Sequence, residues 1–116
     1  MDKEQLDELL KKLVDKDSQV CNMAPCDITT YVSELHYLSD KLSDYMREVD
    51  AEMAKAKTQV IEDLMARDEK ISASVINALC KVKEAEYKAD KDWADRALKL
   101  LNSMRIAALS ARKALD

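Results

Sequence analysis

The stretch from Ile28 to Leu115 makes up most of this chain and contains no glycine and no proline. Sheet proteins depend on turn residues of this kind to connect their strands, so a sheet built from hairpins is disfavoured. Apolar residues recur instead at steps of three and four, the spacing that places them on one face of an α-helix. A chain of 116 residues is one domain at most. The sequence therefore predicts an all-α protein.

Two apolar rows run through this stretch. The first row consists of Ile28, Val32, Leu35, Leu38, Leu42, Met46, Val49, Met53, Ala56, Val60 and Leu64. The second row consists of Val75, Leu79, Val82, Ala89, Trp93, Ala97, Leu100, Met104, Ala107, Ala111 and Leu115. The seven-residue rhythm in the later part of the first row points to left-handed supercoiling. We therefore expect an antiparallel helical hairpin or coiled coil over residues 28–116.

The region between the two rows, residues 66–74, is where the apolar phase slips. We expect the turn of the hairpin here, with Ser72 or Ser74 as the N-cap of the following helix. A single continuous helix is the alternative, because the region lacks the glycine that commonly closes a helix.

A short amphipathic helix is expected before the hairpin, over residues 3–16. Asp2 stands at its N-cap position and Gln5 follows three residues later, the spacing of a capping box. Its apolar stripe is Leu6, Leu9, Leu10, Leu13 and Val14. A helix of this length is marginal alone in water, so the leucine stripe must dock on the long helices or on another subunit.

A linker follows at residues 17–27, because Pro25 ends any helix before it. Asp27 is then the expected N-cap of the second helix, accepting a hydrogen bond from the N–H of Thr29 or Thr30. The sequence thus divides into a short N-terminal part, residues 1–27, and a helical hairpin, residues 28–116.

The third helix has a wider apolar arc than one partner helix requires. Beside the second row lies another flank of Tyr87, Ala94, Leu98, Leu101, Ala108 and Leu109. We expect this flank to stay exposed in a monomer and therefore to drive self-association into a dimer or larger homo-oligomer. The candidate assembly residues are Val49, Met53, Trp93, Leu98, Leu100, Leu101, Met104 and Leu109, with Leu6, Leu9, Leu10 and Leu13 docking the short helix. The tyrosines Tyr31, Tyr45 and Tyr87 are expected at an interface rim.

Charge is unevenly distributed. Residues 28–69 hold ten acids against five bases, a net of −5, whereas residues 88–116 hold seven bases against four acids, a net of +3. Antiparallel packing would place the acid-rich segment beside the base-rich segment, so that their opposite charges attract. The alternative is a nucleic-acid surface on the third helix, formed by Lys88, Lys91, Lys99 and Lys113, as in an accessory protein of recombination or replication that contacts single-stranded DNA.

Few residues suggest chemistry. Cys21 and Cys26 flank the Pro25 segment, with His36 ten residues on, which leaves a metal or redox sensor as a further alternative. Cys80 is interpreted as a small apolar residue of the third helix. The motifs of phosphate-binding loops, serine hydrolases and zinc proteases are missing. We therefore expect no enzyme, no catalytic or metal-binding residue and no cofactor.

Residues 84–91, Glu-Ala-Glu-Tyr-Lys-Ala-Asp-Lys, and residues 98–112, Leu-Lys-Leu-Leu-Asn-Ser-Met-Arg-Ile-Ala-Ala-Leu-Ser-Ala-Arg, resemble the end of small coiled-coil proteins from the early regions of phages and prophages. The resemblance extends over residues 28–115. It implies a helical hairpin in the cytoplasm of a bacterial host, without an assigned activity. With no long apolar run and no signal peptide, we expect a cytoplasmic scaffold, adaptor or inhibitor that binds itself and another protein and does not enter a membrane.

Overall fold

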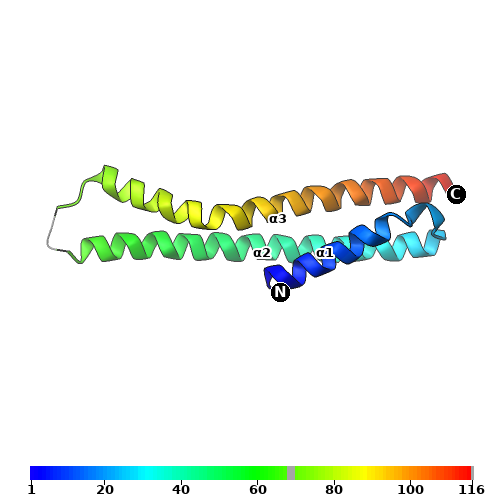
Figure 1. Cartoon of the computed structure of the whole chain (residues 1–116), viewed down its shortest axis with the longest axis horizontal. Helices are drawn as coiled ribbons and strands as arrows, with labels where there is room; N and C mark the ends of the chain where they lie inside the picture. The colour runs from blue at the N-terminus through cyan, green and yellow to red at the C-terminus, as the bar shows by residue number, and fades with distance from the viewer. Residues whose placement is uncertain (68–69, 116) are drawn as a thin grey trace. The chain divides into compact units, whose positions relative to one another are not determined.

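The computed structural model describes residues 1–67 and 70–115. In chain order these form α1 (Lys3–Asp17), the single 3₁₀ turn η1 (Val20–Asn22), α2 (Pro25–Met65) and α3 (Ala73–Leu115) (Figure 1). The described residues contain no strand. The prediction of an all-α hairpin is confirmed. None of the described helices has an apolar segment long enough to cross a bilayer.

The start of α1 is fixed by the predicted capping box. The Asp2 carboxylate accepts from the Gln5 backbone N–H at 2.9 Å, and the Gln5 side chain accepts from the Asp2 backbone N–H at 3.0 Å. These two bonds satisfy donors that the first turn of a helix leaves without an intrahelical partner. The helix ends at Asp17, one residue beyond the expected end.

The start of α2 differs from the expectation. The helix begins at Pro25 rather than near Ile28, and Asp27 lies inside its first turn instead of at the N-cap. The Ala24 carbonyl accepts from the N–H groups of Asp27 and Ile28 at 2.9 and 3.1 Å. Proline favours the first helical position because its fixed φ suits the helix and its missing N–H would have no partner there.

The expected break between the long helices is present, because α2 ends at Met65 and α3 begins at Ala73. A single continuous helix is therefore wrong. Ser72 caps α3: its hydroxyl lies 3.3 Å from the Val75 backbone N–H. Two residues of the predicted turn, Asp68 and Glu69, lie outside the described residues.

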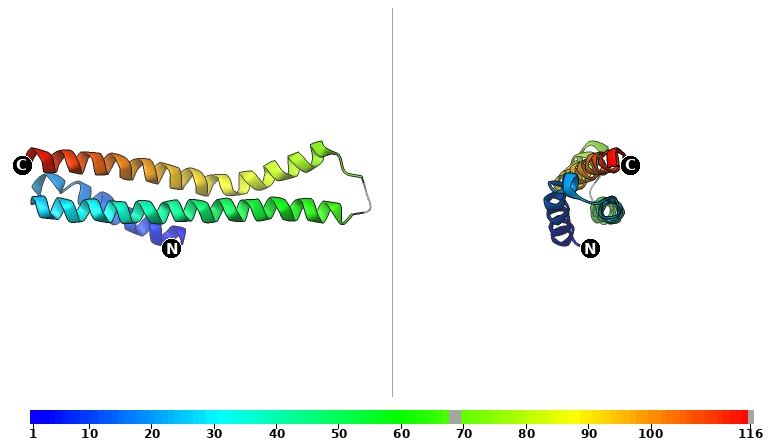
Figure 2. Two further views of the ribbon diagram at one scale, coloured as in Figure 1. Left: turned by 180° about the vertical axis from the view of Figure 1, so that it is seen from behind. Right: turned by 90° about the vertical axis from the view of Figure 1, so that its right-hand side faces the viewer.

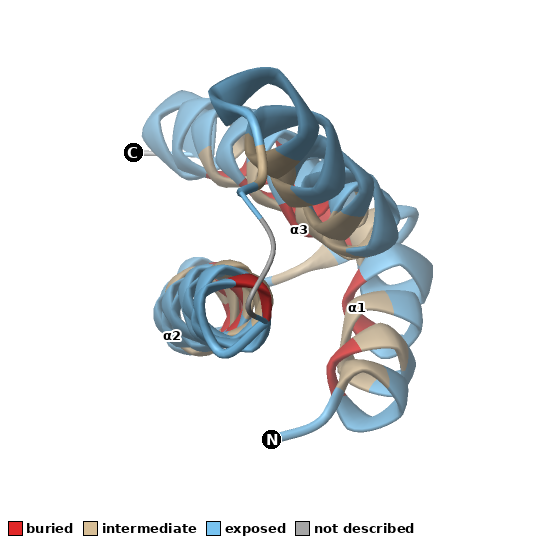
Figure 3. Ribbon diagram, turned by 90° about the vertical axis from the view of Figure 1, so that its left-hand side faces the viewer, coloured by how far each residue is buried: buried red, intermediate tan, exposed pale blue. Residues whose placement is uncertain are grey.

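The chain divides into two compact units, and the division falls within α2 and α3. Met1–Tyr45 and the part of α3 from Ala94 onward form the first, here the three-helix unit; Met46–Trp93 forms the second, the two-helix unit. The three-helix unit holds most of the core, and its buried residues lie where its helices face one another (Figure 3). They are Leu6, Leu13, Val20, Ile28, Tyr31, Leu35, Leu38, Leu42, Ala94, Ala97, Leu101, Met104 and Ala108.

The two-helix unit is an antiparallel pair made by the end of α2 and the start of α3, which lie side by side in both views (Figure 2). Of its described residues, Val49 and Leu64 are buried. Its exposed large apolar residues are Ile61, Met65, Val75, Leu79 and Val82. A pair of helices encloses less surface than three helices do, so much of the apolar surface of this unit faces solvent.

The apolar phase of α3 is one residue later than predicted at most positions, whereas Ala97 and Met104 of the predicted row are buried as expected. The buried residues are Ala94, Ala97, Leu101, Met104 and Ala108, which continue a run of half-buried positions at Ile76, Cys80, Lys83, Tyr87 and Asp90. Their steps alternate between three and four, a heptad repeat over the whole helix. The exposed members of the predicted row are Val75, Leu79, Val82, Ala89, Leu100, Ala107 and Leu115.

Candidate interaction surfaces

The leucine stripe of α1 docks within the three-helix unit. Leu6 and Leu13 are buried, at 0% and 6% exposure, and Leu9 and Leu10 are half-buried. Val14 is exposed. Burial of these side chains supplies the stabilisation that an isolated helix of this length lacks. The chain therefore provides the docking site for its own short helix.

Tyr31 joins α1 to α2. Its hydroxyl lies 3.2 Å from the Leu13 carbonyl oxygen and 3.1 Å from the Asp17 carboxylate, so its proton is shared between two acceptors on α1. Burial raises the pKa of Tyr31 well above its ordinary value, and the charge of Asp17 adds to the shift. Tyr31 is thus a core residue, and its expected place on an interface rim is wrong. Tyr45 and Tyr87 are half-buried.

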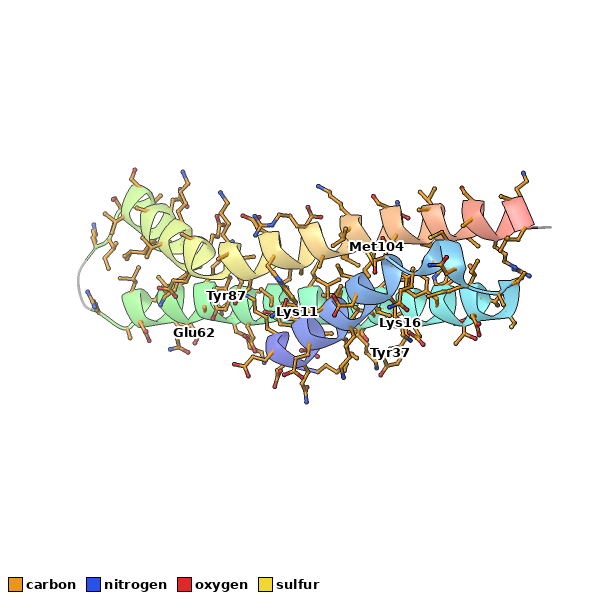
Figure 4. The ribbon with its side chains drawn as sticks, turned by 45° about the vertical axis from the view of Figure 1, so that its right-hand side comes forward. Lys11, Lys16, Tyr37, Glu62, Tyr87 and Met104 are labelled. Carbon is orange, nitrogen blue, oxygen red and sulfur yellow. The ribbon has the colours of Figure 1, made fainter. Side chains whose placement is uncertain are left out.

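An ion pair flanks the same helix crossing. Lys16 of α1, labelled in Figure 4, donates to both carboxylate oxygens of Glu34 on α2, at 3.0 and 2.9 Å. Beside it lies an open groove of about 400 Å³, with Leu9, Leu13, Tyr37 and Leu38 in its lining. Both side chains of the pair remain partly in water, so the pair orients α1 more than it stabilises it.

The candidate assembly residues on the long helices fall into three groups. Val49, Leu101 and Met104 are buried within their own units, Met53, Trp93 and Leu98 are half-buried, and Leu100 and Leu109 are exposed at 44% and 39%. The expectation that Leu101 stays exposed in a monomer is wrong, because its exposure is 1%. Its row is the one that α3 turns toward the core of the three-helix unit.

Two ion pairs mark one side of the two-helix unit. Lys57 of α2 pairs with Glu84 of α3, and Lys91 of α3 pairs with Asp50 of α2 at 2.6 Å. The hydrogen bond and charge of Lys57 lower the pKa of Glu84 below its ordinary value. We call the buried and half-buried positions where the two helices face each other the seam. The paired residues come one position after it in each helix: Asp50 follows Val49, and Glu84 and Lys91 follow the half-buried Lys83 and Asp90.

The opposite side of α3 carries an exposed apolar face, which we call the α3 apolar face. It consists of Val75, Ala78, Leu79, Val82 and Ala89, all exposed. Val75, Leu79, Val82 and Ala89 were predicted as core because their spacing is that of a helical seam. The same spacing in fact belongs to a second apolar row, which no other helix of the two-helix unit covers.

The candidate nucleic-acid lysines are divided between the two units. Lys88 and Lys91 line an open groove of about 370 Å³ in the two-helix unit together with Lys81, Glu84 and Asp92. Lys91 is paired with Asp50, as described above. Lys99 and Lys113 belong to the three-helix unit, where Lys99 pairs with Asp95 on its own helix at 2.9 Å.

The cysteines are free thiols and the only histidine is exposed. Cys21 and Cys26 are exposed free thiols, and Cys80 is a half-buried free thiol. His36 is exposed on α2. Within residues 1–67 and 70–115, no three His, Cys, Asp or Glu side chains form a group suited to a metal ion.

Comparison with known proteins returns no match to a family model, to a characterised protein or to a solved structure.

Proposed function

We propose that this protein is a non-enzymatic helical interaction protein, which self-associates and serves as a scaffold, adaptor or inhibitor for another macromolecule. The observation that carries the proposal is the α3 apolar face. Val75, Leu79 and Val82 are 47%, 38% and 56% exposed along one side of a single helix. Contiguous exposed apolar surface of this kind marks interaction sites in soluble proteins.

The contrast between the units supports this proposal. In the three-helix unit, α1 adds leucines to the core, so the helices there bury a continuous apolar interior. The two-helix unit has no third helix, and Val49 and Leu64 are its buried residues in the part of the chain described. An added helix on the α3 apolar face would give this unit the interior that α1 gives the other.

A role in contacting single-stranded DNA has one supporting observation, the groove with Lys81, Lys88 and Lys91 in its lining. Glu84 and Asp92 lie in the same lining, so the groove is of mixed charge. A nucleic-acid groove combines net positive charge with stacking aromatic rings. The sensor alternative rests on the exposed thiols of Cys21 and Cys26. The proposed setting, a bacterial cytoplasm, rests on the phage resemblance alone.

Sedimentation equilibrium at tens of micromolar tests self-association. The expected mass is twice the 13.2 kDa of the chain or more, and it should fall toward the monomer on dilution. A monomer over the whole concentration range contradicts the proposal. Binding to a single-stranded oligonucleotide at near-physiological salt, with a steep loss of affinity at higher salt, would favour the DNA role instead.

A further inference from the structure

The α3 apolar face is bordered by an acidic row on α2. Successive side chains of a helix are rotated by about 100° around its axis. A residue one position after the seam and a residue one position before it therefore point to opposite sides of the helix pair. The Lys57–Glu84 and Lys91–Asp50 pairs identify the side of the residues that follow the seam. The residues that precede it therefore share the other side. On α2 they are Glu48, Glu52, Lys55, Gln59 and Asp63, all exposed.

This side of the two-helix unit is thus an apolar face with an acidic border. The α2 row has three acids and one base, and Glu86 adds a further acid on α3. Glu86 lies 3.5 Å from Lys83 on its own helix, and Asp63 accepts a hydrogen bond from Gln59 at 2.8 Å. Glu48 and Glu52 have no ion-pair partner among the described residues. The complementary occupant is a helix with exposed apolar residues and a basic border.

One helical segment of this chain has that chemistry. The part of α3 from Ala94 to Leu115 has five bases and one acid, a net of +4, whereas α2 has four bases and nine acids, a net of −5. Its exposed residues in the heptad positions of the α3 apolar face are Arg96, Lys99, Leu100, Ser103, Ile106 and Ala107. This outer face combines large apolar side chains with basic ones.

We infer that the α3 apolar face of one copy is covered by the base-rich outer face of α3, residues 96–107, of a second copy, in an antiparallel arrangement. This inference rests on the proposed self-association and specifies its surface and partner. An antiparallel register that sets Val82 against Ser103 of the second copy also sets Glu86 against its Lys99. Leu79 then lies against its Ile106.

The same register also brings a basic side chain of the second copy close to the acidic row on α2. The pairs Lys57–Glu84 and Lys91–Asp50 show which α2 and α3 residues lie at one level, and they place Glu52 level with Ala89. Ala89 lies opposite Arg96 of the second copy, so that guanidinium group reaches Glu52. Exchanging the two copies leaves an antiparallel register unchanged, so the contact forms twice, as in an isologous dimer.

Charge exchange tests this arrangement with the full chain. In one variant, Glu52→Lys with Glu86→Lys makes the border of the face basic; in the other, Arg96→Glu with Lys99→Glu makes the outer face acidic. Each variant alone opposes like charges in both contacts, so its dimer dissociation constant should rise at least tenfold. An equimolar mixture places opposite charges together in both contacts, so it should form a mixed dimer as tight as the wild type.

A packing variant provides an independent measurement. Val82→Glu places a carboxylate in the centre of the contact and should raise the dissociation constant at least tenfold. Ile61→Glu is the matched control, because Ile61 is exposed on the other side of the two-helix unit, and it should leave the dimer unchanged. Circular dichroism of each variant checks that the helices remain formed.

The outcomes separate this inference from the proposed function. Dimers of wild-type strength from both charge variants and from Val82→Glu would overturn the α3 contact and leave self-association standing through another surface. If both charge variants dimerise more weakly and their mixture does not regain wild-type affinity, the proposed antiparallel contact with residues 96–107 of a second copy is wrong. A wild-type chain that stays monomeric would overturn both proposals and assign the face to a different protein.

Discussion

The Tyr31 hydroxyl lies 3.1 Å from the Asp17 carboxylate and so ties the end of α1 to the beginning of α2. The Tyr31 ring is 1% exposed, and the same hydroxyl also reaches the Leu13 carbonyl oxygen. One side chain therefore contributes both apolar burial and a polar connection at the point where the short helix docks. Buried tyrosines usually have such a partner, because an unpaired hydroxyl would be costly there.

Tyr31→Phe should destabilise the three-helix unit by about 1–2 kcal/mol, since it removes a hydrogen bond with a charged acceptor but keeps the ring. In a chain of this size the melting temperature should fall by roughly 4–8 °C for each kcal/mol. Urea unfolding followed by circular dichroism measures the change. Tyr37→Phe is the control, because Tyr37 is 53% exposed and should give wild-type stability. Equal stability of the two variants would show that the hydroxyl contact does not hold α1.

The stability contributed by Tyr31 should disappear in alkali. The folded state raises the pKa of Tyr31 above its ordinary value of 10.0, by burial first and then by the charge of Asp17. A raised pKa means that the contribution is complete below pH 10.0 and is lost as the pH rises above it, because only the unfolded chain ionises readily there. The difference in unfolding free energy between wild type and Tyr31→Phe should therefore shrink above that pH. A difference that stays constant would contradict the assigned burial.

Leu101→Ala should cost about 2–5 kcal/mol of unfolding free energy, because Leu101 is 1% exposed and its truncation leaves a cavity in the three-helix unit. Leu109→Ala makes the same chemical change on the same helix, where the side chain is 39% exposed, and should cost less than about 1 kcal/mol. Thermal and urea unfolding compare the two. Similar losses of unfolding free energy in the two variants would show that the row containing Leu101 is not the buried row of α3.

Ser72→Ala should destabilise the start of α3 by about 1 kcal/mol, because the Ser72 hydroxyl accepts from the Val75 N–H. Ser74→Ala is the matched control, and a change of less than about 0.5 kcal/mol is expected there. Amide hydrogen exchange in the first turn of α3 locates the effect. Faster exchange after Ser74→Ala alone would identify Ser74 as the cap.

The local features of this chain could be read from its sequence. Asp2 and Gln5 suffice to predict the start of α1, because a capping box involves residues three apart and needs no tertiary contact. Ser72 was one of two expected caps for the same reason. The start of α2 was misplaced because Asp27 and Pro25 offer competing local signals, and the proline at the first helical position prevailed.

The sequence by itself determined that the chain forms helices, where they begin and end to within a few residues, and that α3 carries more apolar surface than one neighbour can cover. Only the tertiary structure decided which apolar row is buried. Leu100 and Leu101 are chemically identical neighbours, yet one is 44% exposed and the other 1%. Both rows satisfy helical periodicity, and Ala97 and Met104 belong to both, so periodicity does not choose between them. The choice depends on which row faces the other helices of the three-helix unit. Periodicity reports that a face is apolar, whereas its neighbours decide whether that face is a core or a surface.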